Sequence, residues 1–185
     1  KGVLETHFKE ILDELSKMLV EIRTVPELTD IVSGKAKIDE LKEVPIEDLL
    51  GRQQAKLDRP AMAKLISGKR VLITGCGGSI GSELVRQIGS LAPTQLILTD
   101  ASEHALYMID QEIRRVFPSL SIVSKLLDVR DRDAVFRAMD THRPDYVFHA
   151  AALKHVPIVE AQACEGVITN VIGSRNVAEA AAASN

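Results

Sequence analysis

The sequence predicts an α/β fold in which a doubly wound parallel sheet carries helices on both faces. From residue 69 onward, short apolar runs alternate with longer segments of helical periodicity, which is the pattern of β–α–β units. We expect strands at 70–74, 95–99, 120–127 and 144–149, and helices at 80–91, 102–116, 131–140 and 160–183. Right-handed crossovers then give the strand order 3-2-1-4, which is the first half of such a sheet.

The first 68 residues lack this regular alternation. Apolar side chains recur at helical spacing over residues 3–19, and residues 20–25 alternate as a short strand would until Pro26. Only short apolar pieces follow over 27–60, before a brief helix predicted at 61–66. We interpret residues 1–68 as a small, mostly helical connector and 69–185 as a Rossmann-type domain that lacks its later strands.

Composition narrows the class of protein. A formal net charge of −3 over 185 residues argues against a nucleic acid held by bulk electrostatics. No apolar run approaches the ~18 residues of a membrane span, and no signal peptide is evident. Cys76 and Cys164 are too few for a disulfide framework, and the five histidines show no ligand-like spacing, so we predict no metal. These features predict a soluble domain of a reducing compartment.

The strand at 70–74 leads into the turn Gly75-Cys-Gly-Gly-Ser-Ile-Gly81, whose glycine spacing is typical of dinucleotide-binding sites. Gly75 permits a tight turn, Gly78 lets the backbone approach a pyrophosphate, and Gly81 removes a side chain where helix meets strand. Free N–H groups at the helix start would face the phosphates. The predicted phosphate site therefore comprises Gly75, Gly77, Gly78, Ser79, Ile80 and Gly81. Cys76, within the turn, is interpreted as a tolerated small residue rather than a redox group.

Asp100 ends the second strand, 19 residues after Gly81. A carboxylate at this distance binds the adenosine-ribose hydroxyls of NAD and repels the 2′-phosphate of NADP. No arginine follows at once, which favours NAD over NADP. The alternative role for Asp100 is to cap the helix that starts near Ser102.

Several motifs closely resemble the extended short-chain dehydrogenase/reductase superfamily and, within it, the CapD-type nucleotide-sugar 4,6-dehydratases. The motif Ala-Ala-Leu-Lys-His-Val-Pro at 151–157 is more specific than the glycines; the other matching segments are Lys69–Leu84, Asp100–Tyr107, Asp128–Asp131 and Asn170–Ala180. Residues 25–30 and 44–52 resemble the segment before the catalytic domain in long, membrane-anchored members. By that resemblance, residues 3–25 correspond to the end of a preceding domain.

The resemblance implies roles for further residues. Asp128 and Val129 would lie against adenine, although Asp128 could instead cap the helix at 131–140. Ala150, Ala151 and Ala152 would lie beside the nicotinamide ribose, where a plain strand-to-helix turn would also favour alanine. Lys154 and His155 would line the substrate entrance, unless they form an ordinary solvated pair. Asn170 would hold a water or a backbone carbonyl near the site, unless it is merely an exposed helix position.

The resemblance also implies the reaction. In the family, bound NAD accepts a hydride from C4 of a UDP-N-acetylhexosamine, the C6 hydroxyl leaves, and the hydride returns to C6. The family's acid/base residues lie downstream of the Asn170 segment, and no Tyr-x-x-x-Lys occurs here, so we expect residues 1–185 alone to be inactive. A C4 epimerase and a non-catalytic NAD-binding module remain alternatives. A homo-oligomer on the cytoplasmic side of the bacterial inner membrane, with membrane helices outside this chain, is the expected setting.

Overall fold

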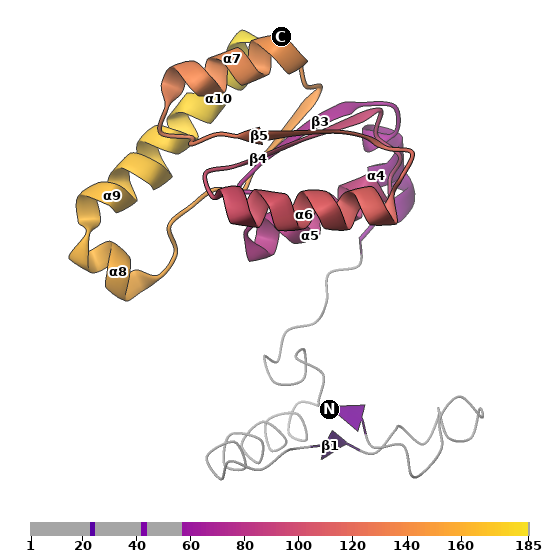
Figure 1. Cartoon of the computed structure of the whole chain (residues 1–185), viewed down its shortest axis with the longest axis horizontal. Helices are drawn as coiled ribbons and strands as arrows, with labels where there is room; N and C mark the ends of the chain where they lie inside the picture. The colour runs from indigo at the N-terminus through magenta and orange to yellow at the C-terminus, as the bar shows by residue number, and fades with distance from the viewer. Residues whose placement is uncertain (1–22, 25–41, 44–56, 185) are drawn as a thin grey trace. The chain divides into compact units, whose positions relative to one another are not determined.

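The computed structural model describes residues 23–24, 42–43 and 57–184, and the chain divides into two compact units, residues 1–57 and 58–185 (Figure 1). In the first unit, β1 (Arg23–Thr24) pairs antiparallel with β2 (Lys42–Glu43). The predicted helix over 3–19 lies outside the described residues. Helix α4 (Arg59–Ile66) belongs to the second unit although it falls within the predicted connector, and the domain boundary at residue 68 stays a prediction.

The second unit is built on a four-stranded parallel sheet. Its strands are β3 (Arg70–Thr74), β4 (Gln95–Asp100), β5 (Ser121–Leu126) and β6 (Tyr146–His149). They lie in the order β5-β4-β3-β6, which confirms the predicted order 3-2-1-4. Thr74 pairs with Thr99 on one side and His149 on the other, so the carboxyl ends of three strands meet at one edge.

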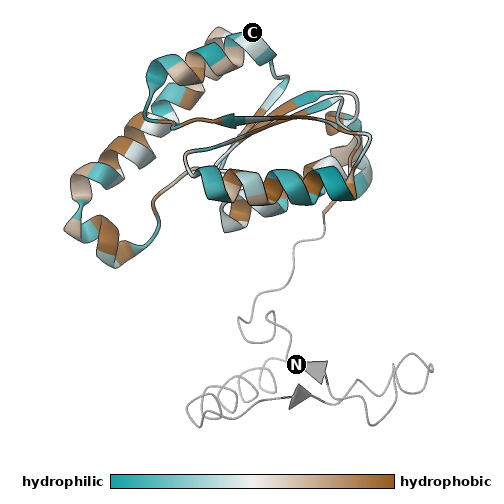
Figure 2. Cartoon of the chain, in the orientation of Figure 1, coloured by the Kyte–Doolittle hydropathy of each residue, from teal (hydrophilic) through white to brown (hydrophobic). Residues whose placement is uncertain are grey.

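Alternating side chains of the strands face two separate helical layers. Val71 and Ile73 pack with α4, α5 (Ser79–Gly89) and α6 (Glu103–Val116) on one face of the sheet. Leu72 points to the other face, toward α7 (Arg132–His142) and α10 (Ser174–Ala183). Figure 1 shows these two groups of helices on opposite sides of the strands. Both faces of the central strands are therefore covered, which is why these strands are apolar at nearly every position (Figure 2).

The segment after β6 differs from the single helix predicted over 160–183. It consists of α8 (Val156–Ala161), α9 (Ala163–Val167), the π-helix η1 (Ile168–Gly173) and α10. The helical start is earlier because Pro157 fits a first turn, where no amide donor is needed. Gln162, at φ −129° and ψ 54°, leaves helical geometry and separates α8 from α9. Apolar periodicity alone reveals neither change.

None of the helices in the described part of the chain is long and apolar enough to cross a membrane.

Candidate functional site

A cleft of about 550 Å³ opens at the carboxyl edge of the sheet. Ligands of open α/β sheets bind at this edge, where the strand order reverses between β3 and β6. Most of the predicted cofactor residues line the cleft, namely Gly75, Gly77, Gly78, Asp100, Asp128, Val129, Ala150, Ala151 and Ala152. Four segments distant in sequence therefore meet around one cleft.

Gly75 forms the tight turn between β3 and the rest of the glycine-rich loop. Its φ of +63° lies in the left-handed region, which residues with a side chain rarely adopt. A Cβ at this position would lie 2.6 Å from the backbone of Ala151, the segment that follows β6. Glycine is thus required twice at this position, once by conformation and once by the close approach of two loops.

Helix α5 presents its amino terminus next to this turn. Its N-cap is Gly78, which offers no side chain to bind the first backbone N–H groups. The N–H of Gly78 itself donates to the carbonyl of Gly75 at 3.2 Å. The first turn, with Ser79 and Ile80, keeps its N–H groups for an anion, and the helix dipole favours negative charge there.

Asp100 connects the end of β4 to the glycine-rich loop. Its Oδ2 accepts a hydrogen bond from the N–H of Gly77 at 2.9 Å, and its Oδ1 accepts one from Ser102 at 2.9 Å. The N-cap of α6 is Ser102, whose hydroxyl accepts from the N–H of Ala105. Asp100 is therefore not the helix cap, and its carboxylate faces the cleft.

Asp128 follows β5 and lines the same cleft as the glycine-rich loop. Asp131, not Asp128, caps α7. The Asp128 carboxylate accepts from the Arg130 guanidinium at 2.6 Å and 2.8 Å, and this hydrogen bonding holds the pKa of Asp128 below its usual range. Arg130 also contacts Glu165 of α9 at 2.9 Å. Two carboxylates thus engage the one cation that lines the cleft among the described residues.

Asn170 of η1 forms hydrogen bonds with the backbone of the segment that follows β6. Its Oδ1 accepts from the N–H of Leu153 at 2.8 Å, and its Nδ2 donates to the carbonyl of Leu153 at 2.9 Å. The backbone after Ala152 is thereby tied at both of its polar groups. The π-helix occurs where this contact is made, and such local departures from α geometry are frequent at functional sites.

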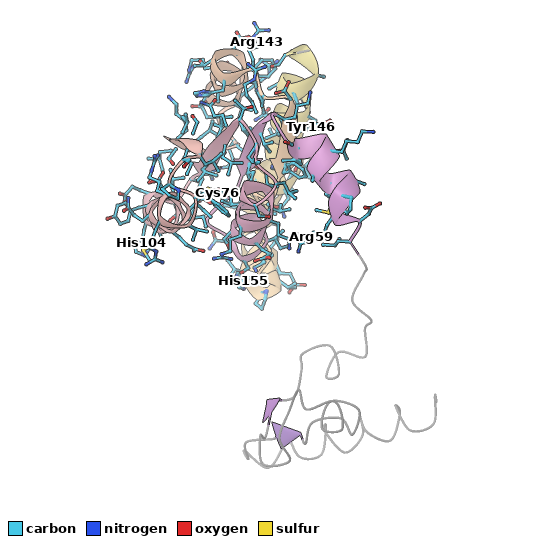
Figure 3. The ribbon with its side chains drawn as sticks, turned by 90° about the vertical axis from the view of Figure 1, so that its right-hand side faces the viewer. Arg59, Cys76, His104, Arg143, Tyr146 and His155 are labelled. Atoms are coloured by element: carbon cyan, nitrogen blue, oxygen red, sulfur yellow. The ribbon has the colours of Figure 1, made fainter. Side chains whose placement is uncertain are left out.

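The other predicted site residues are not among those that line the cleft. Ser79 and Ile80 are exposed on the first turn of α5. A Cβ on Gly81 would collide with the carbonyl oxygen of Gly75, so this glycine serves helix–strand packing. Lys154 and His155 are exposed just before α8, and Figure 3 shows His155 at the periphery of the unit.

Several lining residues were not predicted from the sequence. They are Ala101, Ala105, Leu127, Arg130, Leu153, Ile158, Gln162, Glu165 and Thr169. Ala101, Leu127 and Arg130 each adjoin a predicted residue, so proximity in sequence could have indicated them. No local sequence pattern indicates Glu165, because its position at the cleft depends on the turn between α8 and α9.

Cys76 belongs to the glycine-rich loop, and its side chain is buried in the interior (Figure 3). Burial, with Asp100 nearby, raises the pKa of its thiol to about 12. The thiol therefore stays protonated, which supports its interpretation as a small packing residue.

A larger hollow, of about 780 Å³, lies between α5 and α6. It shares Gly77 and Ala105 with the cleft, but the rest of its lining comes from helix side chains such as Arg86, Met108 and Glu112. Arg86 and Glu112 form an ion pair at 2.6 Å. The hollow is away from the strand ends, so the cleft remains the candidate site.

The residues of the cleft fit a dinucleotide on structural grounds. Backbone N–H groups without a capping side chain could hold a pyrophosphate, and the carboxylate at the end of β4 could bind a ribose. Among the described residues, no group of three His, Cys, Asp or Glu side chains gathers to hold a metal ion.

Comparison with known proteins identifies the family. The profile of the family described as "Polysaccharide biosynthesis protein" matches residues 71–185. The chain belongs to this family. Its relatives include the capsular polysaccharide biosynthesis protein CapD of Staphylococcus aureus, 37% identical over 92% of this chain, and the probable polysaccharide biosynthesis protein EpsC of Bacillus subtilis, 39% identical over 96% of it. The chain spans 29% and 30% of the length of these relatives.

More distant relatives carry names of enzymes. A Campylobacter jejuni UDP-N-acetylglucosamine 4,6-dehydratase (inverting) is 33% identical over 63% of the chain, which covers 33% of that protein. The solved structure of Pen from Bacillus thuringiensis matches with a TM-score of 0.59 and 35% identity, over 64% of this chain and 36% of that one. A Stenotrophomonas maltophila UDP-glucose-4-epimerase with bound NAD matches with a TM-score of 0.55 and 27% identity, over 60% and 33%. The family resemblance and the Rossmann-type fold are thus confirmed.

Proposed function

We propose that this chain is the NAD-binding portion of a UDP-N-acetylhexosamine 4,6-dehydratase that acts in bacterial surface polysaccharide biosynthesis. The observation that supports a role in polysaccharide biosynthesis is the match to CapD and EpsC over nearly the whole chain, including the residues that precede the sheet. The dehydratase reaction is proposed from the similarity to the Campylobacter jejuni 4,6-dehydratase, which, like the epimerases, matches about three fifths of the chain.

The side chains of the cleft support NAD rather than NADP. Asp100 lies at the end of β4, where its charge disfavours a 2′-phosphate on the ribose. Arg130 is the cation that lines the cleft, but Asp128 and Glu165 already neutralise its charge. A 2′-phosphate would therefore meet no uncompensated positive charge from the described lining, and we expect NAD to bind with preference.

The cofactor would supply a hydride acceptor and donor for the sugar. The chain's own residues would bind and orient it. The amino terminus of α5 would hold the pyrophosphate, Asp100 the ribose, and Asp128 with Val129 the adenine. Ala150, Ala151 and Ala152 leave room for the other ribose, and Asn170 secures the backbone beyond them. Lys154 and His155, exposed beside this segment, are candidates for contacting substrate.

A C4 epimerase of the same superfamily is the second candidate, and the NAD-bound epimerase structure supports it. The two reactions are separated by incubating the purified full-length protein with UDP-N-acetylglucosamine and recording the product mass. A dehydratase removes one water from the sugar, whereas an epimerase leaves the mass unchanged and alters the C4 configuration seen by NMR. Bound NAD with neither product would indicate a non-catalytic module.

The cellular setting belongs to the proposal as well. We place the domain in the cytoplasm, where UDP-sugars and NAD are available, as part of a homo-oligomeric protein anchored in the inner membrane by helices outside this chain. Sizing of the full-length protein in detergent, together with membrane fractionation, tests both statements. A monomer recovered entirely in the soluble fraction would contradict them.

A further inference from the structure

His149, the last residue of β6, joins two elements on either side of it. Its Nδ1 lies 2.6 Å from the hydroxyl of Thr74, the last residue of β3. Its Nε2 lies 2.9 Å from the hydroxyl of Ser174, the first residue of α10. Both ring nitrogens are therefore engaged, although His149 is an exposed residue.

The direction of these hydrogen bonds follows from Ser174. Its hydroxyl donates to the backbone carbonyl of Asn170 at 2.7 Å, which uses its only proton. Ser174 must then accept from His149, so Nε2 carries the proton and Nδ1 is the acceptor for Thr74. Burial lowers the pKa of His149, in agreement with a neutral ring.

Each partner of His149 adjoins a segment of the cleft. Thr74 immediately precedes Gly75 of the glycine-rich loop, and His149 immediately precedes Ala150. The carbonyl that accepts from Ser174 belongs to Asn170, whose side chain holds Leu153. One chain of hydrogen bonds thus connects three places. These are the start of the glycine-rich loop, the start of the alanine segment (residues 150–152), and Asn170, which binds the backbone of Leu153 just after that segment.

We propose that His149 is a positioning residue for the cofactor cleft, held as the neutral Nε2–H tautomer. By bonding Thr74, it adds a side-chain contact to the backbone pairing that joins the start of the glycine-rich loop to the segment after β6, and it orients Asn170 through Ser174. The inference rests on the proposed NAD site. Thr74 is 1% exposed, so its hydroxyl has no water to replace the imidazole and the arrangement depends on the histidine.

Two amide variants of His149 test its contacts with Thr74 and Ser174 separately. Asparagine places its amide near the position of Nδ1, so His149→Asn keeps an acceptor for Thr74 and loses Ser174. Glutamine places its amide near Nε2, so His149→Gln keeps a donor for Ser174 and loses Thr74. His149→Phe removes both contacts. The matched control is His104→Asn, at an exposed position of α6 outside this network (Figure 3).

Two measurements on the full-length protein decide the inference. The first is the ¹⁵N NMR spectrum of histidine-labelled protein, in which His149, assigned by its loss in the variants, should show the Nε2–H tautomer. The second is the dissociation constant for NAD. We expect His149→Phe to weaken binding about tenfold, each amide variant to weaken it less, and His104→Asn to leave it unchanged.

A third comparison tests the coupling. Thr74→Val should weaken NAD binding in the wild-type background but not in the His149→Gln background, where the Thr74 contact is already lost. Additive effects, an Nδ1–H tautomer, or wild-type affinity in His149→Phe would each overturn the inference while leaving the NAD site intact. A wild-type protein that binds no dinucleotide would instead remove the proposed function, and with it the role given to His149.

Discussion

The carboxylate of Asp100, at the end of β4, accepts a hydrogen bond at 2.9 Å from the backbone N–H of Gly77, in the loop that follows β3. The same side chain that would bind a ribose therefore also shapes the loop that would bind the pyrophosphate. This double role makes Asp100 the most informative single position of the cleft, because its replacement changes both recognition and geometry.

Asp100→Asn should weaken NAD binding by about tenfold and reduce the preference for NADH over NADPH. The amide keeps an oxygen for Gly77 but loses the charge that repels a 2′-phosphate and binds two hydroxyls. Titration of both reduced cofactors by fluorescence measures the change. Asp140→Asn, at an exposed position on α7, is the control. Tighter binding of NADPH than NADH by the wild type would contradict the assignment of NAD.

Gly78→Val should abolish dinucleotide binding and preserve the fold. A Cβ at Gly78 would lie 3.4 Å from the carbonyl oxygen of Gly75 and meet no other described atom within 4 Å, so the protein can accommodate it. The added methyl groups would occupy the space through which a pyrophosphate approaches the backbone. Circular dichroism and NAD titration check the two halves of the prediction. Undiminished binding would show that this loop does not hold phosphates.

Gly81→Ala should lower the stability of the fold itself. Its Cβ would collide with the backbone carbonyl of Gly75, which cannot move without displacing the whole turn. We expect a loss of at least about 2 kcal/mol in the free energy of unfolding. Urea denaturation measures this loss. Gly68→Ala cannot serve as the control, because Gly68 has a φ of +73°, which alanine rarely adopts. Stability equal to that of the wild type would mean that α5 is packed less closely on β3 than described.

Cys76 should resist thiol reagents that modify Cys164 quickly. Cys76 is buried and its thiol pKa is raised to about 12, whereas Cys164 is exposed. At pH 8, thiolate-dependent labelling with a chromogenic disulfide should show one fast and one very slow phase. Two fast phases in the native protein would contradict the buried position, and Cys164→Ser assigns the fast phase.

Stability should fall as the pH decreases below about 6.5, in part because of His142. Burial, with Lys125 nearby, lowers the pKa of His142, and its Nε2 is buried without a hydrogen-bond partner among the described residues. The unfolded state therefore binds more protons between the folded pKa and about 6.5, and unfolding is favoured as the pH falls through that window. Urea unfolding at several pH values should show that the free energy of unfolding depends less on pH in His142→Asn than in the wild type.

Local patterns in the sequence predicted the parts of the fold that depend on neighbouring residues. The apolar runs of β3 and β4, the glycine spacing and the position of Asp100 all lie within about thirty residues, where periodicity and turn chemistry decide the structure. The strand order followed because right-handed crossovers leave one arrangement open. The helix predicted over 160–183 ends at the predicted residue, but it starts earlier and is divided, because Gln162 and the π-helix carry no periodic pattern.

By itself, the sequence determined the α/β class, the strand order and the glycine-rich turn with its carboxylate, since each arises from short-range periodicity and backbone conformation. Only the tertiary structure decided that Arg130 is neutralised by Glu165, that Asn170 clamps Leu153, and that His149 bonds Thr74 and Ser174. These contacts join residues up to 75 positions apart. Their partners are selected by how the helices pack on the sheet, and no local spacing encodes that packing.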